Sequence, residues 1–327
     1  MSLAALPKVE LHLHLEGAAP PAFVRGLAAE KGISVAGLFD AAGAYAFDDF
    51  WQFLRVYEAA TAVLQTPADY ARLTTAVLEE RAADGVIYLE AFLSPDFCGG
   101  GDLAPWREYL AAIREAADAA EAGGITLRGI VTCIRHLGPD QARRVALCAA
   151  ETAGDWLVGF GIAGDERPFH PRDFAWAFDC AREAGLRLTA HAGEWDGPAS
   201  VRATLEHLRP ERIGHGVRAF EEPALVAHLA ETGTVLEVCP GSNIALGLYP
   251  DWRAHPVDRL RRAGVTVTLS TDDPPFFHTT LSAEYDRLAE AFGWEADDFA
   301  ALNRAALDAA FCDDATRDRL APRLARD

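Results

Sequence analysis

Eight apolar, β-rich runs recur along this chain of 327 residues, and segments of helical character separate them. The runs cover residues 9–15, 85–93, 126–134, 157–163, 186–193, 212–217, 234–240 and 265–271. Strands that alternate with helices pair in parallel, and helices then bury both faces of the sheet. At this length the pattern predicts one α/β domain, residues 1–327, built as a (β/α)8 TIM-type barrel. A doubly wound sheet is the alternative, but no G-x-G-x-x-G motif follows the first run.

Alanine-rich segments with helical periodicity fill most of the intervals, and several end in glycine, a common helix cap. They cover 69–85, 107–124, 139–154, 171–185, 201–210, 222–233 and 257–264, and a closing helical region follows residue 280. Residues 18–68 break the pattern with a helical insertion after the first strand. This insertion carries the aromatic residues Phe39, Phe47, Phe50, Trp51 and Phe53. In a barrel such a connection lies over the active-site face, where it could serve as a lid.

Charge and composition exclude several classes of partner. Lys and Arg number 30 against 49 Asp and Glu, a formal net charge of −19, whereas nucleic-acid binding needs a basic footprint. No apolar run approaches 18 residues without charge, so we expect neither a signal peptide nor a membrane span. The six cysteines form no C-x-x-C pair, which is typical of free thiols in a reducing cytoplasm. The pattern leaves the oligomeric state open.

The first apolar run reads V-E-L-H-L-H-L-E-G over residues 9–17 and places His12 and His14 two positions apart. Side chains alternate faces along a strand, so both imidazoles point the same way, with Cα atoms roughly 6.6 Å apart at about 3.3 Å per residue. Two imidazoles that converge above one strand can bind a metal ion, or they can simply bond to neighbouring carbonyls. The ends of the other strands decide between these interpretations.

Polar side chains gather at the carboxyl ends of the later strands, where barrel enzymes carry their chemistry. The fifth run ends in H-A-G-E, with His191 and Glu194, and the sixth contains His215. The eighth run ends in S-T-D-D-P, with Asp272 and Asp273. Three imidazoles and one carboxylate suit a borderline divalent ion, with zinc as the default. Such a centre keeps one position open for water, whose pKa the ion lowers.

Six short motifs follow one another from residue 6 to residue 274. They are L-P-K-V-E-L-H-L-H-L-E-G-A (6–18), A-G-D-E (163–166), T-A-H-A-G-E (189–194), R-I-G-H-G-V-R (212–218), C-P-G-S-N (239–243) and S-T-D-D-P (270–274). Together they resemble the adenosine deaminase family of the amidohydrolase superfamily, in family order and over nearly the whole chain. The resemblance implies a barrel that deaminates a purine and binds one zinc ion per chain through four residues: His12, His14, His191 and Asp272.

The resemblance also implies roles for the residues around that centre. Glu194 would be the general acid that protonates purine N1, and His215 would orient or deprotonate the attacking water. Asp273 would hold the hydroxide and contact N7, the backbone N–H of Gly164 would bond N3, and His14 would also line the substrate site. A carboxylic acid aimed at N1 stabilises a transition state in which charge builds on that atom.

Glu16 is the main departure from the family pattern, which typically has aspartate there to meet the ribose 5′-hydroxyl. The extra methylene moves the carboxylate by about 1.5 Å. It is typical of bacterial relatives, among them adenine deaminases and deaminases of 5′-modified adenosines such as aminodeoxyfutalosine. The residues Gly164-Asp165-Glu166 are kept, however, whereas the adenine-specific branch tends to carry serine and glutamate. The sequence therefore favours adenosine or a closely related 6-aminopurine nucleoside, with adenine or a 5′-modified adenosine as the alternative.

Two other classes of function stay open. One is a metal hydrolase of amides or esters, although no strand end offers the lysine that two-metal relatives use as a bridge. The other is a catalytically silent barrel that binds purines or partners, against which the intact Glu194 and His215 argue. Ser242 and Asn243 are candidates only for contacts behind the site. The remaining histidines are expected mostly to pack or to face solvent: His136, His170, His207, His228, His255 and His278.

Overall fold

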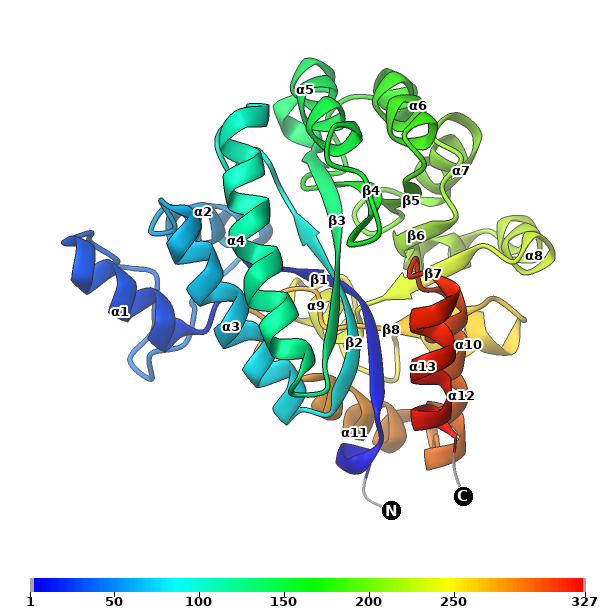
Figure 1. Cartoon of the computed structure of the whole chain (residues 1–327). Coiled ribbons are helices and arrows are strands. Elements are labelled where there is room, and N and C mark those ends of the chain that lie inside the picture. The colour runs from blue at the N-terminus through cyan, green and yellow to red at the C-terminus, as the bar shows by residue number, and fades with distance from the viewer. Residues whose placement is uncertain (1–2, 326–327) are drawn as a thin grey trace.

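The computed structural model describes residues 3–325, so residues 1, 2, 326 and 327 of the predicted domain lie outside the described part. Eight parallel strands, hydrogen-bonded in the order β1 to β8, form a nearly closed barrel with helices around it (Figure 1). The strands are β1 (Lys8–His14), β2 (Val86–Leu93), β3 (Thr126–Ile134), β4 (Leu157–Ala163), β5 (Arg187–Ala192), β6 (Arg212–His215), β7 (Val235–Val238) and β8 (Val267–Leu269). The predicted (β/α)8 fold is therefore confirmed.

The helices lie close to the predicted segments, and six of them begin at a proline. Proline suits the first helical position because its fixed φ fits the helix and its missing N–H would have no partner there. The α-helices are α1 (Pro21–Lys31), α2 (Phe50–Thr61), α3 (Pro67–Ala83), α4 (Leu103–Glu121), α5 (Pro139–Ala150), α6 (Ala175–Glu183), α7 (Pro198–His207), α8 (Pro223–Thr232), α9 (Pro240–Ala245), α10 (Val257–Arg262), α11 (Leu281–Phe292), α12 (Ala296–Ala309) and α13 (Asp314–Leu324). Within residues 3–325, no helix is both long enough and apolar enough to cross a membrane.

The barrel closes between β1 and the residues that follow β8. Leu13 forms an isolated parallel bridge with Asp272. The N–H of Asp272 donates to the carbonyl of His12 at 3.2 Å, and the N–H of His14 donates to the carbonyl of Asp272 at 3.0 Å. The two ends of the strand order are thus joined at the carboxyl rim, next to both histidines of the first motif.

The opposite end of the barrel is covered by the C-terminal helices α12 and α13. Residues of these helices and of the turn between them pack on Val9 and Leu11 of β1 and on Tyr88 of β2. Phe311, in the turn, packs in one cluster with Phe92 of β2, Ile130 of β3 and Val158 of β4. The chemistry is therefore confined to the carboxyl rim, and the amino-terminal end is devoted to packing.

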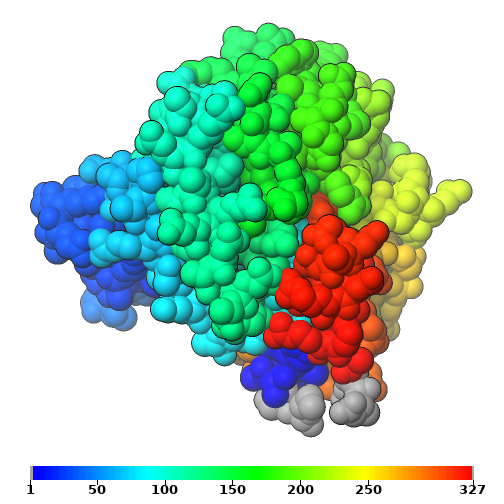
Figure 2. Space-filling view, in the orientation of Figure 1, coloured from blue at the N-terminus to red at the C-terminus, as the bar shows by residue number. Residues whose placement is uncertain are grey.

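Residues 18–68 form α1, α2 and the loops around them, in agreement with the helical insertion that the sequence predicted. The side chains of α1 protrude from the barrel at the left of the space-filling view (Figure 2). The aromatic residues of the insertion are mostly packed: Tyr45 stacks on Phe276 with ring centroids 3.9 Å apart, and Phe53 lies 5.2 Å from Phe277. Phe276 and Phe277 follow β8, so the insertion is anchored on the carboxyl rim.

The short helix α9 was missed in the sequence, where residues 234–240 were expected to be strand throughout. β7 ends at Val238, and Pro240 begins α9 two residues later. Proline has no N–H for the next ladder bond, so it ends the strand and its fixed φ favours the first helical turn. This turn carries Ser242 and Asn243 into the space behind the rim.

Candidate active site

Four of the predicted residues converge at the carboxyl rim of the barrel. His12 and His14 come from β1, His191 from β5, and Asp272 directly follows β8. Each offers one ligand atom, and these atoms all lie within 4.8 Å of one another. The two-residue spacing of the histidines on β1 and the meeting of β1 with the end of β8 together produce this cluster.

The geometry of the cluster fits a single metal ion. Nε2 of His14 lies 3.3 Å from Nε2 of His191, and Oδ1 of Asp272 lies 3.2 Å from His14 Nε2 and 3.5 Å from His12 Nε2. Within the described residues, the buried Nε2 of His12 has no hydrogen-bond partner. A buried polar atom without a partner is costly. A cation bound between these nitrogens and the carboxylate would satisfy them all.

Glu237 of β7 orients the His12 ring from behind. Nδ1 of His12 lies 2.7 Å from Glu237 Oε2, so His12 donates there and turns the lone pair of Nε2 toward the cluster. Although burial alone would raise it, the charge of Arg212 and the bond with His12 lower the pKa of Glu237 to about 2. Arg212 also pairs with Glu90. Glu90, Arg212 and Glu237 were not predicted as functional residues from the sequence, where their signal is a charged residue inside each of three buried strands.

Glu194 stands beside the cluster, in the loop after β5. Burial, with the charges of Asp272 and Glu166, raises the pKa of Glu194 well above its ordinary value. The carboxylate of Glu166 accepts four successive backbone N–H groups, those of residues 193–196, and the hydroxyl of Ser200. Glu166 therefore fixes the loop that carries Glu194, a function that its place in the A-G-D-E motif did not reveal.

His215 ends β6 on the other side of Glu194. Its Nε2 lies 3.8 Å from Glu194 Oε1 and 4.0 Å from Asp272 Oδ2. Burial lowers the pKa of His215 to about 3, so the imidazole is neutral near pH 7. Both His215 (φ 59°) and Asp272 (φ 65°) adopt left-handed backbone conformations. Such strain in residues with side chains is concentrated at functional sites.

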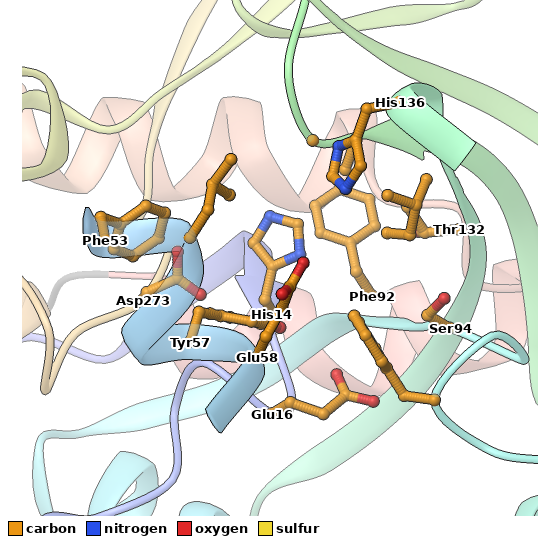
Figure 3. Close-up of a pocket in the computed structure, with 15 residues that line it drawn as sticks. His14, Glu16, Phe53, Tyr57, Glu58, Phe92, Ser94, Thr132, His136 and Asp273 are labelled. Carbon is orange, nitrogen blue, oxygen red and sulfur yellow. The ribbon is translucent and has the colours of Figure 1, made fainter. Parts of the chain in front are cut away.

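A pocket opens from this centre toward the insertion (Figure 3). Asp273 lines both this pocket and the neighbouring space around the cluster. Burial, with the charge of Asp272, raises the pKa of Asp273 well above its ordinary value. A Cβ on Gly17 would meet Oδ1 of Asp273 at 1.5 Å, so only glycine allows this approach. Gly164 lines the pocket at φ 92°, where a Cβ would meet Nδ1 of His136 at 2.8 Å.

Glu16 also lines the pocket and is almost fully buried. The hydroxyl of Tyr70 donates to its Oε1 at 3.0 Å, and burial raises the pKa of Glu16 to about 7. The acidic side chains of the A-G-D-E motif do not reach the pocket. Asp165 accepts from Arg167 and Glu166 holds the β5 loop, so the motif contributes only Ala163 and Gly164 to the lining.

Comparison with known proteins relates this site to a family. The sequence profile described as adenosine deaminase matches residues 7–326. The chain belongs to the adenosine deaminase family. An adenine deaminase from Chelativorans sp. (strain BNC1) is 48% identical over 320 residues, which are 98% of this chain and 98% of the relative. The family recognised from the six sequence motifs is thereby confirmed.

Solved structures agree with this assignment of the deaminase family. An adenine deaminase from Arthrobacter aurescens superposes with a TM-score of 0.90 at 30% identity and covers 98% of both chains. An amidohydrolase from Burkholderia ambifaria with bound zinc has a TM-score of 0.87 at 30% identity and covers 98% of this chain and 91% of that chain. The protein is a hydrolytic deaminase, and its His/Asp cluster fits one metal ion, as predicted.

Proposed function

We propose that this deaminase is a zinc-dependent adenine deaminase that converts adenine and water to the 6-oxopurine and ammonia. The observation that carries the proposal is a buried acid, Glu194, beside a His/Asp cluster that fits one metal ion. The 48% identity with an adenine deaminase over nearly the full length supports adenine. Adenosine, the substrate that the sequence favoured, is less well supported and is kept as the competing hypothesis.

The metal would be held by His12, His14, His191 and Asp272. Zinc bound there supplies Lewis-acid activation of a water molecule near neutral pH. Glu237 keeps the lone pair of His12 Nε2 directed at the ion through its bond to Nδ1.

Glu194 would deliver a proton to N1 of the purine. Burial raises the pKa of this carboxyl and so favours the protonated form that a proton donor needs, and Glu166 holds its loop in place through the backbone. Attack at C6 breaks the aromaticity of the ring and places negative charge on N1. A proton donor at that atom therefore stabilises the transition state more than the bound substrate.

Asp273 and Gly164 would orient the ring. A protonated Asp273 carboxyl can donate to N7, an acceptor, and its Oδ1 has no hydrogen-bond partner among the described residues. The backbone N–H of Gly164 would donate to N3. Contacts on both edges of the purine hold C6 against the attacking water.

Glu16 would select the free base over the nucleoside. It lines the pocket at the position where the family typically has an aspartate that meets the ribose 5′-hydroxyl, and its pKa of about 7 leaves it able to accept or donate a hydrogen bond. A free base has an N–H at position 9 that can reach a carboxylate, whereas a nucleoside has a sugar carbon there. An unpaired buried polar group would weaken binding of the wrong substrate.

The test is ammonia release by zinc-loaded protein with adenine, adenosine, 2′-deoxyadenosine and a 5′-modified adenosine. We expect the highest kcat/KM for adenine, and a loss of about 10³-fold in Glu194→Gln with zinc still bound. Glu58→Gln is the matched control, because Glu58 also lines the pocket but is exposed. A higher kcat/KM for a nucleoside would refute the substrate, and no ammonia from any aminopurine would refute the reaction.

We also infer that residues 1–327 act as one domain, with the insertion 18–68 as a lid. The inner face of α2 lines the pocket with Phe53, Leu54 and Tyr57. The guanidinium of Arg167 lies 4.5 Å from the ring of Trp51 on α2, which ties the insertion to the loop after β4. The six cysteines are unpaired, which supports a reducing compartment such as the cytoplasm.

A further inference from the structure

A chain of hydrogen bonds runs from the backbone of α10 to the imidazole of His215. The N–H of Val257 lies 3.2 Å from Nδ1 of His255. Nε2 of His255 lies 3.2 Å from Oδ1 of Asn243, and Nδ2 of Asn243 lies 3.2 Å from Nδ1 of His215. The three side chains are fully buried, so water does not compete for these groups.

The direction of each of these three hydrogen bonds follows from the first one, in which the backbone N–H of Val257 is the donor. A backbone N–H can only donate, so Nδ1 of His255 accepts and its hydrogen must sit on Nε2. That Nε2–H donates to Asn243, which must therefore present Oδ1 to His255 and its NH2 group to His215. Nδ1 of His215 then accepts, and the hydrogen of this neutral ring sits on Nε2.

We propose that Asn243 and His255 are positioning residues that hold His215 with its hydrogen on Nε2, so that His215 donates a hydrogen bond to the attacking oxygen. This inference rests on the proposed deaminase function. Nε2 of His215 faces Glu194 Oε1 at 3.8 Å and Asp272 Oδ2 at 4.0 Å, two acceptors on either side of the space for that oxygen. In this tautomer His215 orients the water and does not deprotonate it.

The fold explains how two distant segments reach His215. Pro240 starts α9 directly after β7 and turns Asn243 inward, and His255 lies just before α10. Neither Asn243 nor His255 is among the described residues that line the pocket, so both act through His215. From the sequence, Asn243 was expected only to make contacts behind the site, and His255 was expected to pack or to face solvent.

The first experiment measures the tautomer directly. The imidazole ¹⁵N shifts of zinc-loaded protein at pH 7 distinguish a nitrogen that carries hydrogen from one that does not, and His215→Gln assigns the signals. We expect His215 and His255 to carry hydrogen on Nε2 alone. Hydrogen on Nδ1 of either ring would overturn the proposal whether or not the protein deaminates adenine, so this failure is distinct from failure of the proposed function.

The second experiment reverses the direction of the hydrogen bond between residue 243 and Nδ1 of His215. In Asn243→Asp both carboxylate oxygens accept, so His215 should move its hydrogen to Nδ1 and present a bare Nε2 to the site. We expect kcat to fall about 100-fold, the usual effect of losing one transition-state donor, with KM and zinc content nearly unchanged. His255→Gln is the conservative variant: its amide can still donate to Asn243, so the His215 tautomer and most of the activity should be retained.

The proposal has two parts: Asn243 and His255 keep the hydrogen of His215 on Nε2, and that hydrogen contributes to catalysis. An unchanged His215 tautomer in Asn243→Asp would show that Asn243 does not set it. A reversed tautomer with unchanged kcat would show that the donor has no catalytic effect. If Asn243→Asp does not fold, the ¹⁵N spectra of the wild type and of His255→Gln still show whether His215 carries its hydrogen on Nε2.

Discussion

Replacement of Arg212 by methionine should destabilise the protein far more than the same change at an exposed arginine. Arg212 is 1% exposed inside the barrel, where it pairs with Glu90 and Glu237, both fully buried. Methionine keeps apolar contact with Phe311, whose ring lies 3.5 Å from the guanidinium carbon. The change therefore removes mainly the charge and leaves two carboxylates without a cation.

The expected loss is about 3–5 kcal/mol in the free energy of unfolding, as for other broken buried ion pairs. The matched control is Arg202→Met, because Arg202 pairs with Glu222 at the surface, where the two side chains are 44% and 39% exposed. Surface pairs contribute about 0–1 kcal/mol. Urea unfolding at pH 7 with saturating zinc measures both losses.

Two results would refute the reasoning about buried charge. One is a loss in Arg212→Met within about 1 kcal/mol of the loss in Arg202→Met, which would mean that the carboxylates find other partners or protonate without cost. The other concerns the double variant Arg212→Met/Glu90→Gln. Removing one stranded carboxylate should recover part of the stability, and no recovery would show that lost packing caused the effect.

Two further predictions concern buried glutamates. Glu16→Asp should lower the ratio of kcat/KM for adenine to kcat/KM for adenosine about 10-fold, because the shorter side chain leaves room for a sugar. The ammonia-release assay measures both values. An unchanged ratio would mean that Glu16 does not select the substrate. Burial raises the pKa of Glu284 from 4.5 to about 8, so the folded state retains a proton that the unfolded state loses. Stability should then fall by up to about 1.4 kcal/mol per pH unit across that window. Glu284→Gln should flatten the fall in urea unfolding measured from pH 5 to 8, and an equally steep fall would contradict the assignment.

The arrangement of the metal-fitting cluster could be anticipated because local rules govern it. The two-residue spacing of His12 and His14 determines which face of a strand they share. The rule that chemistry gathers at the carboxyl ends of barrel strands placed His191 and Asp272 at the same rim as other polar residues, and the family resemblance then singled these two out. Neither inference needs to know how distant side chains pack.

The groups behind the site could not be anticipated, because their partners depend on register and packing. Glu237 was visible as a charge inside a buried run, but its bonds to His12 and Arg212 depend on how β7 lies beside β6 and across from β1. His255 reaches Asn243 only because α9 replaces the expected end of a strand. The A-G-D-E motif favoured a nucleoside in the sequence, but sequence does not show that Glu166 points to the loop after β5.

The closure of the barrel at Leu13 and Asp272 sets an order of events during synthesis. Two ligands of the cluster, His12 and His14, leave the ribosome well before Asp272, which lies more than 250 residues further along the chain. Because Asp272 meets β1 only when the last strand docks, a nascent chain lacks the complete set of ligands until the ring is shut. Tight capture of the ion should therefore report completion of the barrel, and it should be absent from ribosome-bound chains that end before residue 272 has emerged.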